Sequence, residues 1–269
     1  MSGLLLEKKN AVIYGGGGAI GGAVARVFAR EGARVFIAGR TRARLDAVAG
    51  DIAAQGGAVE AEAVDVLDQR AVERHADAVA AQAGGIDIAL NAVSVMHDQG
   101  TLLADLSLEE FIRPIDGFLR QLFITSKAVA RHMGRERPGV ILTLSEPGAK
   151  LAVGGILGHG VSAAGKEAFS RLLAAELAPA NIRVVDIRPH AVADAPAAGS
   201  YTKDLFERPA AAAGQSVQEF LEVGMVQGTL LKRLPTLSEI AETAAFLASD
   251  RAGAMTGTVV NLSAGALVD

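Results

Sequence analysis

Five side chains between residues 145 and 166 have the types and the spacing for acid–base chemistry. Lys166 carries an ammonium group, with His159 seven residues and Ser162 four residues before it, and Glu146 follows Ser145 at the end of an apolar run. An imidazole with an ordinary pKa of about 6.5 suits proton transfer at neutral pH. A partly desolvated carboxylate can act as an acid or a base. A serine hydroxyl is a much weaker acid, so Ser162 cannot by itself deliver a proton.

A second group of residues, near the N-terminus, has the pattern of a phosphate-binding turn. Tyr14 ends an apolar run and is followed by the letters GGGGAIG. Glycines at this place allow a tight turn and let backbone N–H groups approach a pyrophosphate at the start of the next helix. We therefore expect a dinucleotide cofactor to contact Gly15, Gly17, Gly18, Ile20 and Gly21.

The residue after the second apolar run indicates which dinucleotide binds. An NAD site usually has an acidic residue here, which binds the ribose hydroxyls. This chain has Arg40, followed by Arg42 and Arg44, and no acid. A guanidinium binds a 2′-phosphate, whereas a carboxylate would repel one. The sequence therefore predicts NADP(H) rather than NAD(H), with Arg40 on the 2′-phosphate and at least one of the other two arginines solvated at a helix start.

Short apolar runs alternate with longer amphipathic segments along the whole chain. This pattern is typical of parallel strands connected by helices, in a sheet that is covered on both faces. Strands are expected at residues 11–14, 34–38, 59–64, 86–91, 140–145, 182–187 and 258–262, and helices at 20–31, 42–55, 69–83, 108–134, 162–177 and 239–249. We predict one α/β domain over residues 1–269, a doubly wound parallel sheet of the Rossmann type.

The composition excludes several other classes of protein. The 269 residues are 50% hydrophobic and 21% charged, which suits a large buried core and not a disordered chain. A net charge of −4 with 4% aromatic residues is unlike a nucleic-acid-binding protein. There is no cysteine nucleophile, and no His, Asp or Glu spacing predicts a metal site. No segment has the pattern of a signal peptide or the length of a membrane span, so we expect a cytoplasmic protein.

Several positions with possible ligand contacts fall at the predicted carboxyl ends of strands. They are Tyr14, Gly39, Asp65, Asn91, Ser145 and Pro189. Ligands of doubly wound sheets bind outside this edge, so one cleft for cofactor and substrate is expected there. An Ala-, Pro- and Gly-rich stretch at 193–214 and a helix-like stretch at 218–231 follow the sixth strand. We predict that residues 193–231 form a substrate loop or lid; the alternative for the first stretch is a surface excursion.

These motifs together resemble those of the short-chain dehydrogenase/reductase family. The turn is similar to the family's T-G-x-x-x-G-x-G, with Tyr14 and Ala19 in place of the Thr and the second Gly. Residues 90–94, LNAVS, fall where the family has N-N-A-G, and residues 233–269 follow the family's C-terminal pattern almost throughout. The resemblance implies that the cofactor site is completed by Asp65 and Val66, which contact adenine, and by Asn91, Lys166, Pro189 and Val192.

The resemblance also marks the positions at which the family places its catalytic Ser, Tyr, Lys and Asn. Lys166 matches the Lys, whereas Ser162 stands at the Tyr position and Phe118 at the Asn position. The Ser position falls on Ser145 or Glu146. The family's phenol, which donates the proton, is therefore replaced in this chain.

Three side chains are candidates for that proton donor, and each has a plainer alternative. His159 has the longer spacing to Lys166 that the enoyl-thioester reductase branch of the family uses, but a His in a glycine-rich loop can equally be solvated. Glu146 can work as an acid or base, or can form an ion pair with Lys166 and perform no chemistry. His190 can reach the substrate or only fill space.

We predict an NADP(H)-dependent oxidoreductase that transfers hydride to a carbonyl or a conjugated C=C of a small molecule, such as a 3-oxoacyl or enoyl compound, with an atypical proton donor. The alternatives are a catalytically silent nucleotide-binding protein and a non-redox lyase or isomerase. The resemblance further implies a homodimer or homotetramer that forms through the helices at 108–134 and 162–177.

Overall fold

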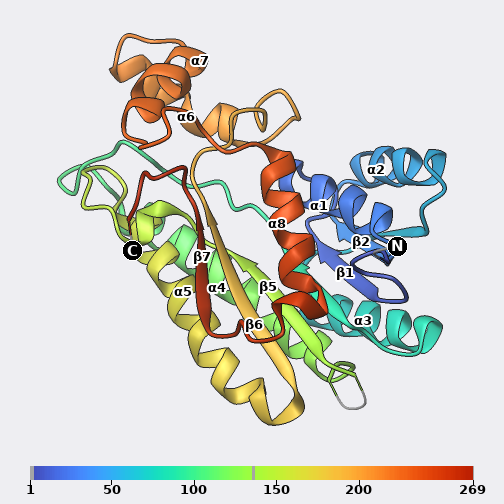
Figure 1. The fold of residues 1–269 in the computed structure, drawn as a ribbon. Coiled ribbons are helices and arrows are strands. Elements are labelled where there is room, and N and C mark those ends of the chain that lie inside the picture. Colours follow the sequence, from blue (N-terminus) through green and yellow to red (C-terminus); the bar gives the residue numbers. More distant parts are fainter. Residues whose placement is uncertain (1–2, 135–136, 269) are drawn as a thin grey trace.

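The computed structural model describes residues 3–134 and 137–268, and its centre is a parallel sheet of seven strands in the order β3-β2-β1-β4-β5-β6-β7 (Figure 1). The strands are β1 (Asn10–Tyr14), β2 (Arg34–Gly39), β3 (Val59–Ala63), β4 (Ile88–Asn91), β5 (Gly139–Leu144), β6 (Ile182–Pro189) and β7 (Thr258–Leu262). The strand order reverses between β1 and β4, where a doubly wound sheet opens a crevice at its carboxyl edge. The predicted fold, a single Rossmann-type α/β domain, is confirmed.

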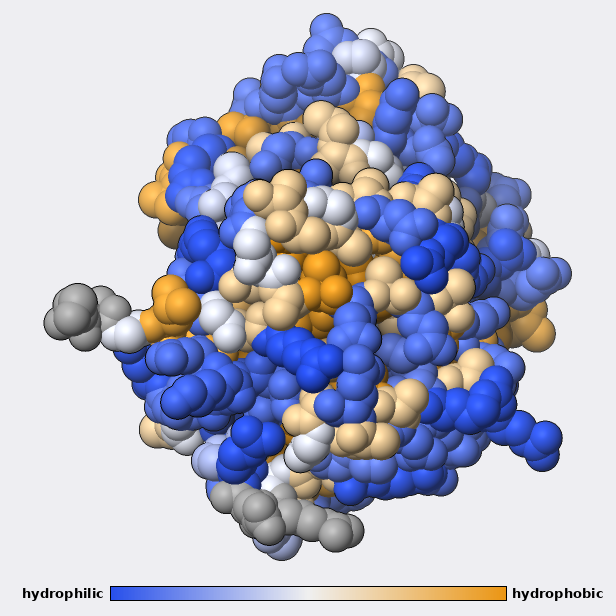
Figure 2. All heavy atoms as spheres, turned by 90° about the vertical axis from the view of Figure 1, so that its right-hand side faces the viewer, coloured by the Kyte–Doolittle hydropathy of each residue, from blue (hydrophilic) through white to orange (hydrophobic). Residues whose placement is uncertain are grey.

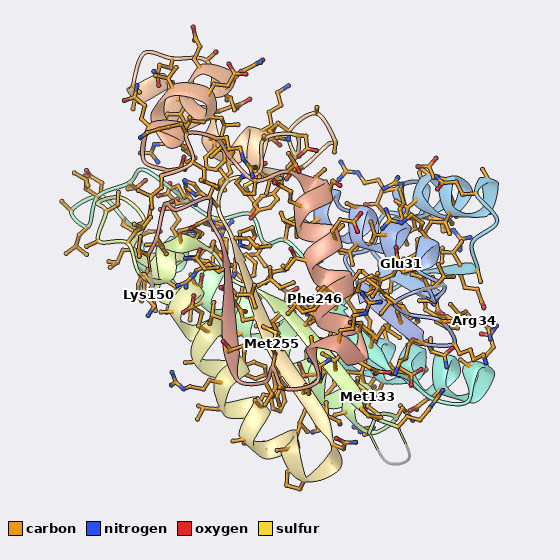
Figure 3. The ribbon with its side chains drawn as sticks, in the orientation of Figure 1. Glu31, Arg34, Met133, Lys150, Phe246 and Met255 are labelled. Carbon is orange, nitrogen blue, oxygen red and sulfur yellow. The ribbon has the colours of Figure 1, made fainter. Side chains whose placement is uncertain are left out.

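Helices cover both faces of this sheet, and their apolar sides form two buried clusters with it. On one face lie α1 (Ala19–Arg30), α2 (Arg42–Ala54) and α8 (Leu237–Ala248), and on the other lie α3 (Gln69–Ala83), α4 (Leu108–Ala130) and α5 (Leu157–Leu177). Side chains fill the layers between the sheet and the helices (Figure 3). Met133, for example, packs against Gly139 at the start of β5. No helix in the described ranges has both the length and the apolar character to cross a bilayer.

α5 begins at Leu157, five residues before the start predicted at Ser162. Its first turn contains Gly158 and Gly160, and glycine is a poor helix former. Tertiary packing overrides that propensity, because a Cβ on Gly158 would lie 2.6 Å from the carbonyl oxygen of Phe111 on α4. Only glycine lets the two helices approach this closely. The early start places His159 inside the helix, so the prediction of a glycine-rich loop at this residue is wrong.

The segment that follows β6 has more helical structure than the sequence predicts. It contains α6 (Thr202–Ala212), the short α7 (Val217–Glu219) and a π-helical turn η3 (Phe220–Met225), all beyond the carboxyl ends of the strands (Figure 1). A small apolar cluster of Leu205, Phe206, Leu221 and Leu234 holds these turns together. The stretch at 193–214, which was predicted to lack regular structure, therefore includes a helix. In the helix-like stretch predicted at 218–231, helical structure ends before Gly228.

Candidate active site

A pocket of about 350 Å³ opens at the carboxyl edge of the sheet. Figure 2 shows one face of the molecule, on which apolar side chains gather at the centre of a largely hydrophilic surface. Of the residues predicted for the site, the pocket wall includes Gly18, Ile20, Asn91, Ser145, Glu146, His159, Lys166, Pro189 and Val192. Gly15, Gly17, Gly21, Arg40, Asp65, Val66 and Ser162 are not among the residues of this wall.

The glycine turn has the geometry of a phosphate-binding turn. Gly15 has a φ of +84°, and a Cβ there would lie 2.5 Å from the carbonyl oxygen of Ala92. A Cβ on Gly21 would lie 2.3 Å from the carbonyl oxygen of Gly15, so the turn folds tightly against the start of α1. Gly18 is the N-cap of α1 and no side chain caps the described helix end, which leaves its first N–H groups for a ligand. The cradle therefore fits an anionic pyrophosphate.

Tyr14, which stands where the family has Thr, does not obstruct this turn. Its side chain is buried on the α3 side of the sheet, where Tyr14 Oη lies 3.2 Å from Nδ1 of His75. Burial raises the pKa of Tyr14, so the phenol stays protonated.

At the end of β4, Asn91 Nδ2 donates to Thr125 Oγ1 at 2.9 Å and fixes the strand to α4. Asn91 thus shapes the loop that closes against the turn.

The three arginines near the end of β2 differ in their partners. Arg42 Nε donates to Asp46 at 2.8 Å on the surface of α2, and Arg44 Nη1 donates to the Gly199 carbonyl at 3.4 Å. Arg40 is exposed, and its guanidinium makes no hydrogen bond or ion pair with any residue that the structure describes. Further along the same edge, Asp65 is exposed and Val66 is buried after β3. Arg40 is therefore the arginine that has its donors free for a ligand.

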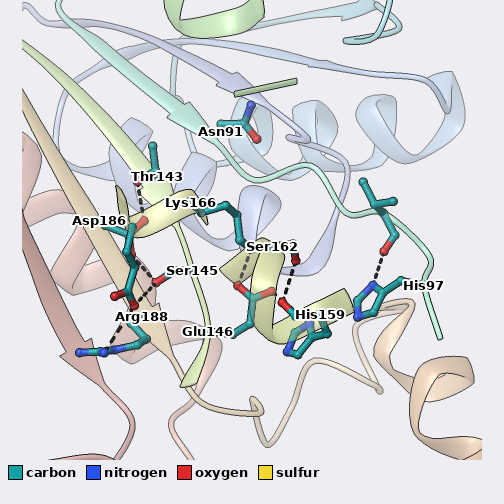
Figure 4. A network of polar contacts seen from close by, with 12 residues as sticks. Asn91, His97, Thr143, Ser145, Glu146, His159, Ser162, Lys166, Asp186 and Arg188 are labelled. Carbon is teal, nitrogen blue, oxygen red and sulfur yellow. Dashed lines mark hydrogen bonds and ion pairs between the residues drawn. The ribbon is translucent and has the colours of Figure 1, made fainter. Parts of the chain in front are cut away.

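Lys166, Glu146 and His159 come together on the pocket wall (Figure 4). Lys166 Nζ donates to one oxygen of the Glu146 carboxylate, and His159 Nδ1 lies 3.5 Å from the other oxygen. The Lys166 side chain is only 5% exposed, and its Nζ lies 4.2 Å from the centre of the Phe118 ring. A paired carboxylate and an aromatic face together replace the water that the buried ammonium has lost. The predicted contact between Glu146 and Lys166 is therefore present.

His159 is buried, so the solvated alternative for it is wrong. Its side chain is 11% exposed, and loss of hydration lowers the pKa of His159 to about 4, against the raising effect of Glu146. The ring stacks on that of His97, with centroids 4.9 Å apart and planes at 6°. Burial also lowers the pKa of His97, whose Nδ1 lies 2.7 Å from the Val95 carbonyl oxygen and must donate to it. Both imidazoles are therefore neutral at neutral pH.

The remaining polar candidates differ in what they can offer to a ligand. Ser162 is fully buried, and its hydroxyl donates to the His159 carbonyl at 2.8 Å, so it serves the helix and not the pocket. His190 lines the pocket, and burial lowers its pKa. Two further residues were not among those predicted for the site: Tyr201, which lines the pocket, and His97, whose ring stacks on that of His159. The position of His97 just after β4 was the available signal for it, whereas Tyr201 comes from a segment without a readable pattern.

Gly148 leaves the space that the His159 ring occupies, which gives a test of this arrangement. A Cβ on Gly148 would lie 2.8 Å from Cδ2 and 2.9 Å from Nε2 of the imidazole. We expect Gly148→Ala to push the ring toward solvent and to raise the His159 pKa from about 4 toward the ordinary value of about 6.5. A titration of the histidine ring protons by NMR measures this shift. The control is Gly154→Ala, whose Cβ meets Leu102 at an ordinary 3.4 Å; equal His159 pKa values in both variants would contradict the arrangement.

Comparison with known proteins agrees with the fold. Residues 17–266 match the family model described as Enoyl-(Acyl carrier protein) reductase. The chain is 30% identical over 262 residues to 3-oxoacyl-(acyl-carrier-protein) reductase FabG of Chlamydia muridarum, covering 97% of this chain and 98% of that protein. It is also similar to a short-chain type dehydrogenase/reductase from Mycobacterium marinum (TM-score 0.80, 28% identity, covering 98% and 97% of the two chains). A short chain dehydrogenase from Burkholderia cenocepacia, solved in complex with NADP, matches with a TM-score of 0.81 and 25% identity over 97% and 99% of the two chains. The chain therefore belongs to the short-chain dehydrogenase/reductase family of oxidoreductases.

Proposed function

We propose that the protein is an NADP(H)-dependent reductase of a 3-oxoacyl or enoyl compound, in which an altered set of residues handles the proton. The observation that carries the proposal is the Glu146 carboxylate, placed between Lys166 and His159 on the wall of a pocket that also contacts the glycine turn. The similarity to 3-oxoacyl-(acyl-carrier-protein) reductases favours this substrate class.

NADP(H) fits the residues at the carboxyl edge of the sheet. The turn of Gly15, Gly17, Gly18, Ile20 and Gly21 would hold the pyrophosphate, and Asp65 and Val66 would lie at the adenine. Arg40 would hold the 2′-phosphate with donors that no described residue takes. Asn91, Lys166, Pro189 and Val192 line the pocket where the nicotinamide half would extend. When bound, the nicotinamide supplies the hydride.

The proton is assigned to the Lys166–Glu146 pair. The ammonium and the carboxylate together hold a proton that can pass to a substrate oxygen as negative charge develops on it. Glu146, with 22% of its side chain exposed, is open enough to take a replacement proton from solvent. His159 is neutral at neutral pH, so it is not assigned the proton, and its ring fills the space beside the Glu146 carboxylate. Ser145, on the same wall, is the hydroxyl that can donate to the substrate oxygen.

The same ion pair also fits the alternative of a nucleotide-binding protein without turnover. A carboxylate that does no more than neutralise Lys166 would leave the lysine as a donor to the cofactor. Under this alternative, replacing Glu146 changes the stability of the protein and leaves its nucleotide binding unchanged. Variants of Glu146 therefore separate the two functions.

We further propose that residues 193–231 form the substrate lid. Ser200, Tyr201, Leu205, Phe206 and Met225 of this segment all line the pocket. On α6, Arg208 Nη1 lies 2.9 Å from Asp98 Oδ2, so an ion pair that is exposed on its arginine side joins α6 to the loop after β4. A surface pair of this kind contributes little stability, which suits a segment that opens to admit substrate.

We also propose a homodimer or homotetramer that forms through α4 and α5. These helices pack together and carry large apolar side chains on their outer sides. Leu108 and Phe123 on α4 are 76% and 53% exposed, and Leu172 on α5 is 60% exposed. Apolar residues at this exposure favour burial against a second copy of the chain.

Glu146→Gln tests the assignment of the proton. The amide keeps the size of the side chain, and its oxygen can still accept a hydrogen bond from Lys166. Unlike a carboxylate, however, it does not take up and release a proton at any pH at which the enzyme is folded. We expect kcat for reduction of a 3-oxoacyl thioester to fall by about 100-fold or more, with NADPH affinity almost unchanged. Glu109→Gln, on an 84% exposed side chain of α4, is the matched control. An unchanged kcat in Glu146→Gln would remove Glu146 from the mechanism.

Arg40→Ala tests the choice of cofactor. Loss of a charge-assisted contact to the 2′-phosphate should weaken NADPH binding by about tenfold or more, whereas NADH, which lacks this phosphate, should bind almost as before. Arg42→Ala is the control, since that guanidinium already pairs with Asp46. Calorimetric titration of wild type and both variants with NADPH and NADH gives the six dissociation constants. Equal losses for both dinucleotides in Arg40→Ala would refute the 2′-phosphate assignment.

A further inference from the structure

A buried polar network lies behind the pocket wall, around Asp186 on β6 (Figure 4). Asp186 is fully buried. Each of its two carboxyl oxygens contacts a hydroxyl group, one from Thr143 on β5 and the other from Ser145 just after β5. Thr143 Oγ1 lies 2.6 Å from Asp186 Oδ2, and Ser145 Oγ forms a close hydrogen bond with Asp186 Oδ1. Ser145 is the member of this network that also lines the pocket. The state of Asp186 is thereby coupled to a hydroxyl on the pocket wall.

The hydroxyl protons of this network do not suffice for its contacts. Ser170 Oγ donates to the Lys166 carbonyl at 2.8 Å, because a carbonyl can only accept, and this uses the Ser170 proton. Thr143 Oγ1 then has one proton for two neighbours, Ser170 Oγ at 2.8 Å and Asp186 Oδ2. Ser145 Oγ likewise has one proton for Asp186 Oδ1 and for Glu167 Oε1 at 3.2 Å. Four contacts therefore share two hydroxyl protons, and a further proton on a carboxyl group supplies one of the two missing donors.

Asp186 is the carboxyl group that should hold this proton. Glu167 already has a cationic partner, since Arg188 Nη1 lies 3.4 Å from its Oε1. Asp186 has two hydroxyl partners and is removed from water. Burial raises the pKa of Asp186 to about 6, with the two hydroxyl contacts and Lys166 opposing the shift and Glu167 adding to it.

We propose that Asp186, in its protonated form, is a positioning residue that donates to Ser145 and so releases the Ser145 proton, which then turns from Glu167 to the substrate oxygen when substrate is bound. When Asp186 is ionised, the carboxylate accepts the Ser145 proton, and the hydroxyl is turned away from the substrate. The proposal rests on the proposed reductase function, because it assigns Ser145 a substrate contact. It adds to the proposed mechanism a residue in the interior of β6, which does not itself line the pocket.

The sign of the pH dependence follows from this arrangement. The charged groups that face Asp186 are Lys166 and Glu167 on α5, with Arg188 beyond Glu167 on β6. The donor state exists below the Asp186 pKa and disappears as the pH rises through about 6. For a group whose pKa is higher in the folded protein than in the unfolded one, stability is likewise lost as the pH rises through the folded pKa. Activity and stability should therefore both decline over this range because of Asp186.

Asp186→Asn is the variant that tests the proposal. An asparagine amide donates through Nδ2 to Ser145 at every pH and accepts through Oδ1 from Thr143, so it mimics the protonated acid. For wild type, we expect kcat/KM for reduction of a 3-oxoacyl thioester by NADPH to fall about tenfold per pH unit above the Asp186 pKa. We expect Asp186→Asn to keep the low-pH activity within about threefold and to lose this alkaline limb. A limb that persists unchanged in Asp186→Asn would overturn the proposal.

Two further measurements separate this proposal from the proposed function. Ser145→Ala removes the hydroxyl that Asp186 controls, so its lower kcat/KM should also lack the limb, even if Asp186→Asn does not fold. Infrared spectroscopy detects the protonated acid without turnover, through the C=O stretch of a carboxylic acid. We expect this band at low pH, and we expect it to disappear as the pH rises through about 6. The band should be missing at every pH in Asp186→Asn. Absence of this band in wild type would refute the protonated Asp186, whereas its presence in a protein without reductase activity would refute the proposed function alone.

Discussion

The buried ammonium of Lys166 is the constraint around which the site is arranged. A lysine with 4% of its surface exposed is costly to hold in the charged form unless a carboxylate and polarisable groups surround it. Glu146 supplies the negative charge and Phe118 supplies the aromatic face. His159 and His97 then fill the space beside the carboxylate as neutral, stacked rings. The carboxylate of Glu146 and the ring of Phe118 can be understood as compensation for one buried cation.

Close helix packing decides where that cation lies. The contact of Gly158 with the Phe111 carbonyl brings the start of α5 against α4, and the same helix carries His159, Ser162 and Lys166 toward the carboxyl edge of the sheet. Ser162, at the position where the family has its phenol, donates to the helix backbone and gives nothing to the pocket. Ser145 and Glu146, which follow β5, do line the pocket.

The elements with strong periodicity could be predicted from sequence, and those set by tertiary contacts could not. Runs such as residues 11–14 and 140–142 are apolar throughout because both faces of the sheet are covered, so the strands and the parallel sheet were predictable. The early start of α5 depends on a single close approach at Gly158, which no local pattern reveals. The helices between residues 202 and 225 are held by a few apolar contacts in a segment of low periodicity.

The site could be predicted to a similar degree. Glu146, His159 and Lys166 were recognisable because their side-chain chemistry and spacing stood out, whereas their mutual contacts required the fold. Asp186 and Glu167 gave no such signal, because a single acidic residue in a strand or a helix is ordinary in a sequence. Their importance depends on burial and on the number of protons available to their neighbours.

The most direct test of the account is a rapid-mixing experiment with the wild-type protein, NADPH and a 3-oxoacyl thioester, in which the absorbance of the reduced nicotinamide is followed. The account predicts that NADPH is oxidised in step with reduction of the substrate. Binding of NADPH, shown by quenching or calorimetry, with no oxidation in the presence of 3-oxoacyl or enoyl thioesters would contradict it. The Lys166–Glu146 pair would then be a structural ion pair in a nucleotide-binding protein.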